Sequence, residues 1–227
     1  KEGDFTMVFG YPGSTSEYVP SYHIDMVKNY IDPKMISIRT KKIEIIDKAM
    51  NSDPLIRIQY SAKKAGISNS WKKWIGEIQG LERMNTIGKK QAFEGEMTKW
   101  INADKARNTK YGDLLPAYRE LYGSLKDYSM VNSFTNEVFN GVETFSIARN
   151  TRELAGLYEN DKPADSETVQ KVKERLTESS RQFFKDYNRA TDQNLFVELM
   201  KIYGESLDAK WLVPGYIRMK DQCKGNF

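Results

Sequence analysis

The feature that most constrains this fold is a change in hydrophobic period near residue 22. Before it, Phe5, Met7 and Phe9 alternate with Thr6 and Val8, which is the period of two expected of a strand with one buried face. After it, apolar residues recur at helical spacing along most of the chain. The sequence therefore predicts a mainly α-helical protein that opens with a short β element.

The opening segment has the residues of a β-hairpin. Pro12-Gly13 suits a tight turn, because Pro presets φ and Gly supplies the positive φ of a type II turn. Residues 16–22 would return as the second strand, with Pro20 at an edge or a strand end. A lone hairpin is at best marginally stable in water. We therefore predict a β-hairpin over 1–23, completed by a sheet outside this chain, and a helical domain over 24–227.

The helical part carries clear start signals. Asp32-Pro33 and Asp53-Pro54 each place a capping carboxylate before a proline suited to the first turn. One apolar stripe lies between them: Ile36, Ile43, Ile46 and Met50. Further helices are predicted at about 81–107, 113–129, 131–149, 166–188 and 192–210, with a loop at 160–166. We expect a helical bundle of long antiparallel helices.

The helix predicted from Asp53 to about Gln79 has two contrasting faces. Its bulky face, read as a core face, holds Ile56, Tyr60, Ile67, Trp71, Trp74 and Ile78. Its opposite face holds Leu55, Ile58, Ala62, Ala65 and Asn69, with Gly66 beside them. A small-residue face lets a helix or a ligand approach closely. Asn69 is therefore either a buried structural residue, which the residues alone favour, or a ligand contact.

Composition excludes several classes of function. The chain has 35 basic and 31 acidic residues, interleaved along most helices, so neither nucleic acid nor a membrane surface is an expected partner, despite "SWKKW" at 70–74. One histidine and one cysteine, Cys223, leave no His/Cys metal site and no internal disulfide, and Glu94 and Glu96 are read as solvated. No phosphate-binding glycine loop is present. We expect no metal and no cofactor.

Ser21, His23 and Asp25 are the three residue types of a Ser-His-Asp catalytic triad. In the predicted strand, however, their side chains would project in parallel from one face. Side chains at i and i+2 of a strand point in parallel, about 6.5 Å apart, whereas a triad needs them to converge. We therefore expect no catalytic residue in this chain. The chain begins Lys-Glu without a methionine, and we expect it to be a piece of a longer protein.

Two segments together resemble a known family. "GDFTMVFGYPGSTSEY" (3–18) resembles the start of the second β-barrel, and "ISNSWKKWIGEIQGL" (67–81) the signature of the inserted helical domain, in the bacterial periplasmic dipeptidyl peptidases of serine peptidase family forty-six. "GKKQAFE" (88–94) follows at a compatible spacing. The likeness is strong over about residues 3–95. Glu17 stands where a basic residue is more usual in the motif.

The resemblance implies a chymotrypsin-like double barrel with a helical domain inserted in its sequence. The hairpin would then be part of a truncated barrel, and 24–227 a helical cap over the cleft. The catalytic His and Asp would precede this segment and the Ser would follow it, so His23 matches no catalytic position. Such enzymes remove dipeptides from the free amino end of peptides.

Site and location follow from the same resemblance. An Asn in the family's matching segment helps to hold the substrate's α-amino group, and this role carries over onto Asn69. The resemblance also implies a periplasmic location, a cap that moves about a hinge near residues 21–33, and the double barrel of the parent as partner. A homodimer of the parent stays open. The alternative from another class is a non-enzymatic helical binding or scaffold module.

Overall fold

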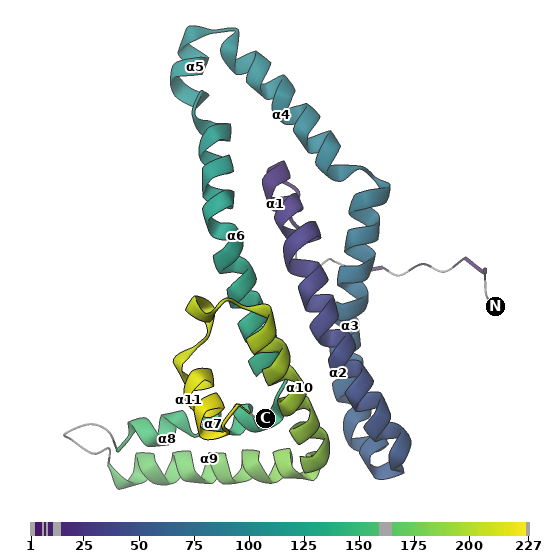
Figure 1. Cartoon of the computed structure of the whole chain (residues 1–227), viewed down its shortest axis with the longest axis vertical. Helices are drawn as coiled ribbons and strands as arrows, with labels where there is room; N and C mark the ends of the chain where they lie inside the picture. Colours follow the sequence, from purple (N-terminus) through teal and green to yellow (C-terminus); the bar gives the residue numbers. More distant parts are fainter. Residues whose placement is uncertain (1–2, 6, 8, 11–14, 159–164, 226–227) are drawn as a thin grey trace.

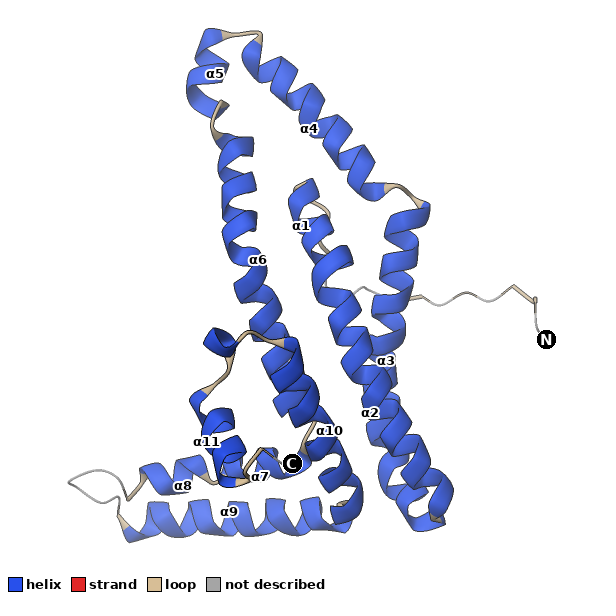
Figure 2. Ribbon diagram, in the orientation of Figure 1, coloured by secondary structure: helices blue, strands red, loops and turns tan. Residues whose placement is uncertain are grey.

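The computed structural model describes residues 3–5, 7, 9–10, 15–158 and 165–225, and most of them are helical (Figures 1 and 2). The α-helices are α1 (Ser21–Met26), α2 (Asp32–Ser52), α3 (Pro54–Arg83), α4 (Thr86–Asn102), α5 (Lys105–Tyr111), α6 (Leu114–Phe139), α7 (Glu143–Asn150), α8 (Arg152–Gly156), α9 (Ser166–Lys185), α10 (Arg189–Ser206) and α11 (Pro214–Gln222). A π-helix, η1 (Val27–Ile31), joins α1 to α2, and a 3-10 turn, η2 (Ala209–Trp211), precedes α11.

The helices form an open frame rather than one closed bundle. α2 and α3 pack as an antiparallel hairpin, as predicted, whereas α4, α5 and α6 form a tall arm that rises from α3 and descends on the other side of α1 (Figure 1). α7, α8 and α9 lie across the base, and α10 returns beside α2 and α6. The prediction of a mainly helical chain with long helices is confirmed, whereas a bundle of antiparallel helices describes only the lower half of the molecule.

The core lies where α2, α3, α6 and α10 meet. Its buried members are Met35, Ile38, Ile46, Tyr60, Phe134, Val138, Val142, Leu195, Leu199, Met200, Tyr203, Leu207 and Tyr216. Ile46 from the predicted stripe of α2 belongs to it, whereas Ile36 and Ile43 are half-buried. The bulky face of α3 is a core face, as predicted: Tyr60 is buried, and Ile56, Ile67 and Trp74 pack against the cluster.

The predicted β-hairpin is not seen. Among the described residues of 3–22 there is no strand, and Ser21 and Tyr22 begin α1. Part of that prediction, including the Pro12-Gly13 turn, lies outside the described residues. The physical reason is the one that makes an isolated hairpin marginal: no partner strand exists among the described residues to satisfy its edges. The division at 23/24 stays a prediction.

α2 begins at Asp32 with Pro33 in its first turn, as predicted, but the predicted capping by Asp32 is wrong. α1, η1 and α2 follow one another without a break, so Pro33 lies inside a long helical run. Proline has no N–H and its ring collides with the carbonyl four residues earlier, here that of Asn29. The wider turn of η1 ends just before it and accommodates this conflict. Asp32 makes no capping hydrogen bond to the first turn of α2, and the residue is buried, with 3% of its surface exposed.

Several helix boundaries also differ from the prediction. The segment 81–107 is divided among α3, α4 and α5, because Asn85 adopts a left-handed conformation (φ 46°) and Asp104 caps α5 through the Arg107 amide. The predicted helix at 113–129 and the first part of the one at 131–149 instead form a single helix, α6, which ends at Phe139. The later part of 131–149 forms α7, which begins at Glu143. The predicted helix at 166–188 corresponds to α9 and the one at 192–210 to α10, whereas α11 was not predicted. Most of the predicted loop at 160–166 lies outside the described residues.

Candidate functional site

The candidate site is the outward face of α3, where the structure places Asn69. The start of this helix is as predicted: Pro54 occupies its first turn, and the Asp53 carboxylate accepts a hydrogen bond from the Leu55 amide at 2.7 Å. Asn69 lies in the middle of α3 with its side chain exposed. Its side chain makes no hydrogen bond with any other described residue. The interpretation of Asn69 as a buried structural residue is therefore wrong for this chain.

The residues around Asn69 leave room for a ligand. Ala65 and Gly66, one turn earlier on the same face, are exposed, and no described atom lies within 4 Å of a Cβ built at Gly66. Leu55 and Ile58, further back on this face, are 60% and 76% exposed. The face thus combines apolar area, small residues and one amide with open hydrogen-bonding capacity.

The opposite face of α3 is held firmly, which fixes the direction of Asn69. The Trp71 indole donates to the Thr40 hydroxyl at 2.9 Å. The Arg39 guanidinium stacks on Trp74, 4.5 Å from the ring centroid, and donates to the Ile67 carbonyl at 2.9 Å. This last bond lies two residues before Asn69, so α2 positions the backbone next to the candidate site.

Arg39 is itself part of a buried ionic cluster. It binds the Glu137 carboxylate of α6 through two hydrogen bonds of 2.9 and 3.0 Å, and Lys42 adds a third of 2.8 Å. Burial lowers the pKa of the Lys42 amine from its ordinary value, while Glu137 opposes that shift. The cluster joins α2, α3 and α6 beneath the candidate site.

A second polar cluster anchors the lower end of α3. The Tyr60 hydroxyl donates to Glu143 at 2.5 Å, and Lys63 binds the other oxygen of the same carboxylate at 2.6 Å. Burial and the nearby Glu143 raise the pKa of the Tyr60 phenol. Asp192 of α10 accepts hydrogen bonds from the Glu143 and Thr144 amides, capping α7. These polar groups hydrogen-bond to one another, so we assign them a structural role.

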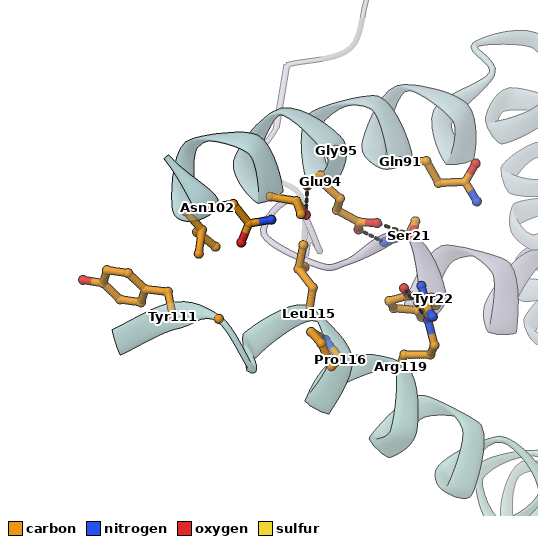
Figure 3. Close-up of a pocket in the computed structure, with 13 residues that line it drawn as sticks. Ser21, Tyr22, Gln91, Glu94, Gly95, Asn102, Tyr111, Leu115, Pro116 and Arg119 are labelled. Carbon is orange, nitrogen blue, oxygen red and sulfur yellow. Dashed lines mark hydrogen bonds between the residues drawn. The ribbon is translucent and has the colours of Figure 1, made fainter. Parts of the chain in front are cut away.

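A cavity of about 560 Å³ lies where α1 meets the arm (Figure 3). Glu94 of α4 accepts hydrogen bonds from the Ser21 amide and hydroxyl at 2.6 and 2.7 Å, and Arg119 of α6 donates to the Tyr22 hydroxyl at 3.1 Å. Glu94, predicted to be solvated, instead satisfies the N-terminus of α1. Each Glu94 oxygen accepts one of these bonds, so we assign this carboxylate a structural role at the start of α1.

The other candidate residues do not converge on a reaction centre. The His23 ring packs edge-on against Tyr122, with 5.7 Å between ring centroids. Ser21 donates a hydrogen bond to Glu94, and Asp25 accepts one from Asn29. They lie on a helix, not on the predicted strand. Within the described part of the chain there is no group of three or more metal-ligating side chains, and Cys223 is exposed and unpaired. No helix in the described ranges has both the length and the apolarity to cross a bilayer.

Comparison with known proteins places this chain in a family. The family model described as Peptidase S46 matches residues 1–222. The chain is 36% identical over 213 residues, 93% of its length, to an Asp/Glu-specific dipeptidyl-peptidase of Flavobacterium psychrophilum. It is 30% identical over 210 residues, 92% of its length, to dipeptidyl-peptidase 7 of Porphyromonas endodontalis. These matches cover 29% and 24% of the two relatives, so the chain spans less than a third of either.

A solved structure supports the fold. The crystal structure of Porphyromonas endodontalis DPP11 in complex with the dipeptide Arg-Glu is similar with a TM-score of 0.73, at 21% identity. The likeness covers 94% of this chain and 30% of that one. It shows that the arrangement of helices described here occurs inside a longer protein. The family match and the sequence identities together identify this chain as a member of the peptidase S46 family.

Proposed function

We propose that this chain is the helical cap domain of a serine-type dipeptidyl peptidase that removes dipeptides from the free amino end of peptides. In this proposal the exposed face of α3 lines the cleft, opposite a catalytic double barrel supplied by the rest of the parent protein in the periplasm. The relatives named dipeptidyl-peptidases support the reaction class. The dipeptide bound to the structural neighbour supports a peptide ligand.

The observation that carries the proposal is the exposed and unbonded side chain of Asn69. Its side chain is exposed, has no hydrogen-bond partner among the described residues, and projects from a helix whose other face is anchored in the core. An amide oxygen can accept a hydrogen bond from a substrate ammonium group.

The chain alone is expected to be inactive. Nucleophilic hydrolysis needs a nucleophile hydrogen-bonded to a base, and the single histidine packs against Tyr122. We expect purified 1–227 to release no dipeptide from a chromogenic substrate, whereas the parent protein does so and loses this activity to a serine-directed inhibitor. Dipeptide release by 1–227 itself would contradict the proposal.

The role of Asn69 is tested by one substitution measured in two proteins. A hydrogen bond to a charged group contributes about 1.5–3 kcal/mol, so Asn69→Ala in the parent is expected to lower kcat/KM by about 10- to 150-fold. The melting temperature of 1–227 is expected to move little, because the side chain is exposed. Gln79→Ala, an exposed amide on the same helix, is the matched control. Normal kinetics with a clearly lowered melting temperature would instead assign Asn69 a structural role.

A further inference from the structure

Two consecutive residues of α2 bind the turn of α3 that carries Asn69. Arg39 donates to the Ile67 carbonyl at 2.9 Å, and the Thr40 hydroxyl accepts a hydrogen bond from the Trp71 indole, also at 2.9 Å. Ile67 and Trp71 stand two residues before and two residues after Asn69. At about 100° per residue, Asn69 lies roughly 160° from each of them around the helix. We call Arg39 and Thr40 the α2 clamp, because they hold α3 on the side directly behind Asn69.

The hydroxyl of Thr40 is itself oriented. It donates to the Ile36 carbonyl, one turn earlier on α2, at 2.8 Å. A hydroxyl has one hydrogen to donate and two lone pairs, so the Thr40 oxygen stays available as an acceptor. The half-buried indole of Trp71 can only donate, and such a group needs an acceptor. This bond therefore fixes the Trp71 ring, and through it one side of α3, against α2.

The guanidinium of Arg39 is held just as firmly. Its Nε and Nη2 donate to the Glu137 carboxylate at 2.9 and 3.0 Å, which leaves Nη1 directed at the Ile67 carbonyl. The guanidinium also stacks on Trp74, 4.5 Å from the ring centroid. The side chains of Arg39 and Glu137 are only 16% and 12% exposed. Because the guanidinium is planar and rigid, the clamp ties this turn of α3 to α6 as well as to α2.

Asn69 depends on this support because its own side chain has none. It makes no hydrogen bond with another described residue, so the rotation of α3 about its axis decides where the amide points. α3 packs mainly along α2 (Figure 1). The tip of a helical side chain lies about 5–6 Å from the axis, so a rotation of about 10° moves it by about 1 Å. A misplacement of about 1 Å can cost on the order of 100-fold in rate.

We propose that Arg39 and Thr40 are positioning residues for the amino-group site: they touch no substrate atom, but they set the rotation of α3 that directs the Asn69 amide at the substrate ammonium. The inference rests on the proposed function, since it assumes that Asn69 binds this ammonium. Arg39 also neutralises Glu137 in the core, so its substitution would mix positioning with stability. Thr40 carries no charge and is the residue through which the proposal is tested.

The test is a ratio measured in the parent protein: kcat/KM for a free-amino dipeptidyl substrate divided by kcat/KM for its analogue without the amino group. Both values scale with the amount of folded enzyme, so a loss of stability leaves their ratio unchanged. Thr40→Val keeps the shape of the side chain and removes the acceptor for the indole. We expect it to lower the ratio by about three- to tenfold, less than Asn69→Ala does, because Arg39 still holds Ile67.

Two further variants serve as controls. Thr40→Ser keeps the hydroxyl and is expected to leave the ratio within about twofold of wild type. Thr177→Val removes a hydroxyl that also donates to the carbonyl four residues earlier, that of Lys173 at 2.8 Å, but lies exposed on α9. It is expected to leave the ratio unchanged. Thr40→Ala removes the same acceptor and takes the place of Thr40→Val if that variant does not fold.

Three results would overturn the proposal, and they separate it from the proposed function. An unchanged ratio in Thr40→Val, together with a large loss in Asn69→Ala, would show that the clamp does not direct Asn69 and would leave the proposed function standing. A loss in Thr40→Ser equal to that in Thr40→Val would assign the effect to the methyl group rather than to the hydroxyl. An unchanged ratio in Asn69→Ala itself would overturn the amino-group role of Asn69, and this inference with it.

Discussion

Glu137 holds two buried cations, and removing its charge is expected to be among the most damaging single changes in this chain. Its carboxylate accepts two hydrogen bonds from Arg39 and one from Lys42, and the side chain of Lys42 is 6% exposed. Breaking a buried ion pair from one side leaves an uncompensated charge and costs about 3–5 kcal/mol. We expect Glu137→Gln to lower the free energy of unfolding by this amount.

The magnitude can be followed by urea denaturation and by heat. For a chain of this size about 1 kcal/mol corresponds to roughly 2–4 °C, so the melting temperature is expected to fall by about 6–20 °C. Lys42→Met added to Glu137→Gln removes the stranded ammonium and is expected to recover at least half of the loss. Glu198→Gln, in an exposed pair with Lys201, is the control and is expected to change stability by less than about 0.5 kcal/mol. A loss below about 1 kcal/mol for Glu137→Gln would refute the reasoning.

Four further outcomes are expected. Burial raises the pKa of the Asp32 carboxyl to about 6; the charge of Glu77 adds to this shift and that of Lys73 opposes it. Between about pH 4 and 6 the folded state therefore retains a proton that the unfolded chain releases. The stability that this group contributes is present below about pH 4 and is lost as the pH rises through 6. Asp32→Asn cannot ionise, so its stability relative to wild type is expected to rise by about 1–2 kcal/mol between pH 4 and 7 in urea titrations; a difference that does not depend on pH would exclude this cause. Gly141→Ala places a Cβ 2.5 Å from Leu199 Cδ1 and is expected to lower stability by about 1–3 kcal/mol in the same assay. Asn85→Ala removes a residue that tolerates the left-handed φ of 46° and is expected to lower the melting temperature by a few degrees, equivalent to about 1 kcal/mol. If the cap closes over its ligand, small-angle scattering of the parent is expected to show a smaller radius of gyration with a bound dipeptide, and identical profiles would contradict closure.

Local chemistry makes α3 predictable. Asp53 and Pro54 encode its start, and the bulky side chains of Tyr60 and Trp74 identify the face that enters the core. The period of the helix alone is enough to place Asn69 on the opposite face. Whether that face is covered could not be predicted in this way, because it depends on elements far along the chain.

The features that sequence reasoning missed depend on long-range contacts. Lys42 is buried because Glu137, 95 residues later, neutralises it, and no local pattern marks such a pair. Ser21 and Tyr22 were predicted to end a strand, yet Ser21 begins α1. Its amide donates to the Glu94 carboxylate, 73 residues away. The π-helix η1 accommodates Pro33 within a continuous helical run, an arrangement that local capping rules do not include.

The most direct test of the central claim measures coupling between Asn69 and the substrate's α-amino group. In the parent protein, kcat/KM is measured for wild type and Asn69→Ala, each with a free-amino dipeptidyl substrate and with its analogue lacking the amino group. If Asn69 accepts a hydrogen bond from the ammonium, the substitution is expected to cost at least about tenfold with the free-amino substrate and less than about twofold with the analogue. Equal losses with both substrates would contradict the account, because Asn69 would then act without contacting the amino group.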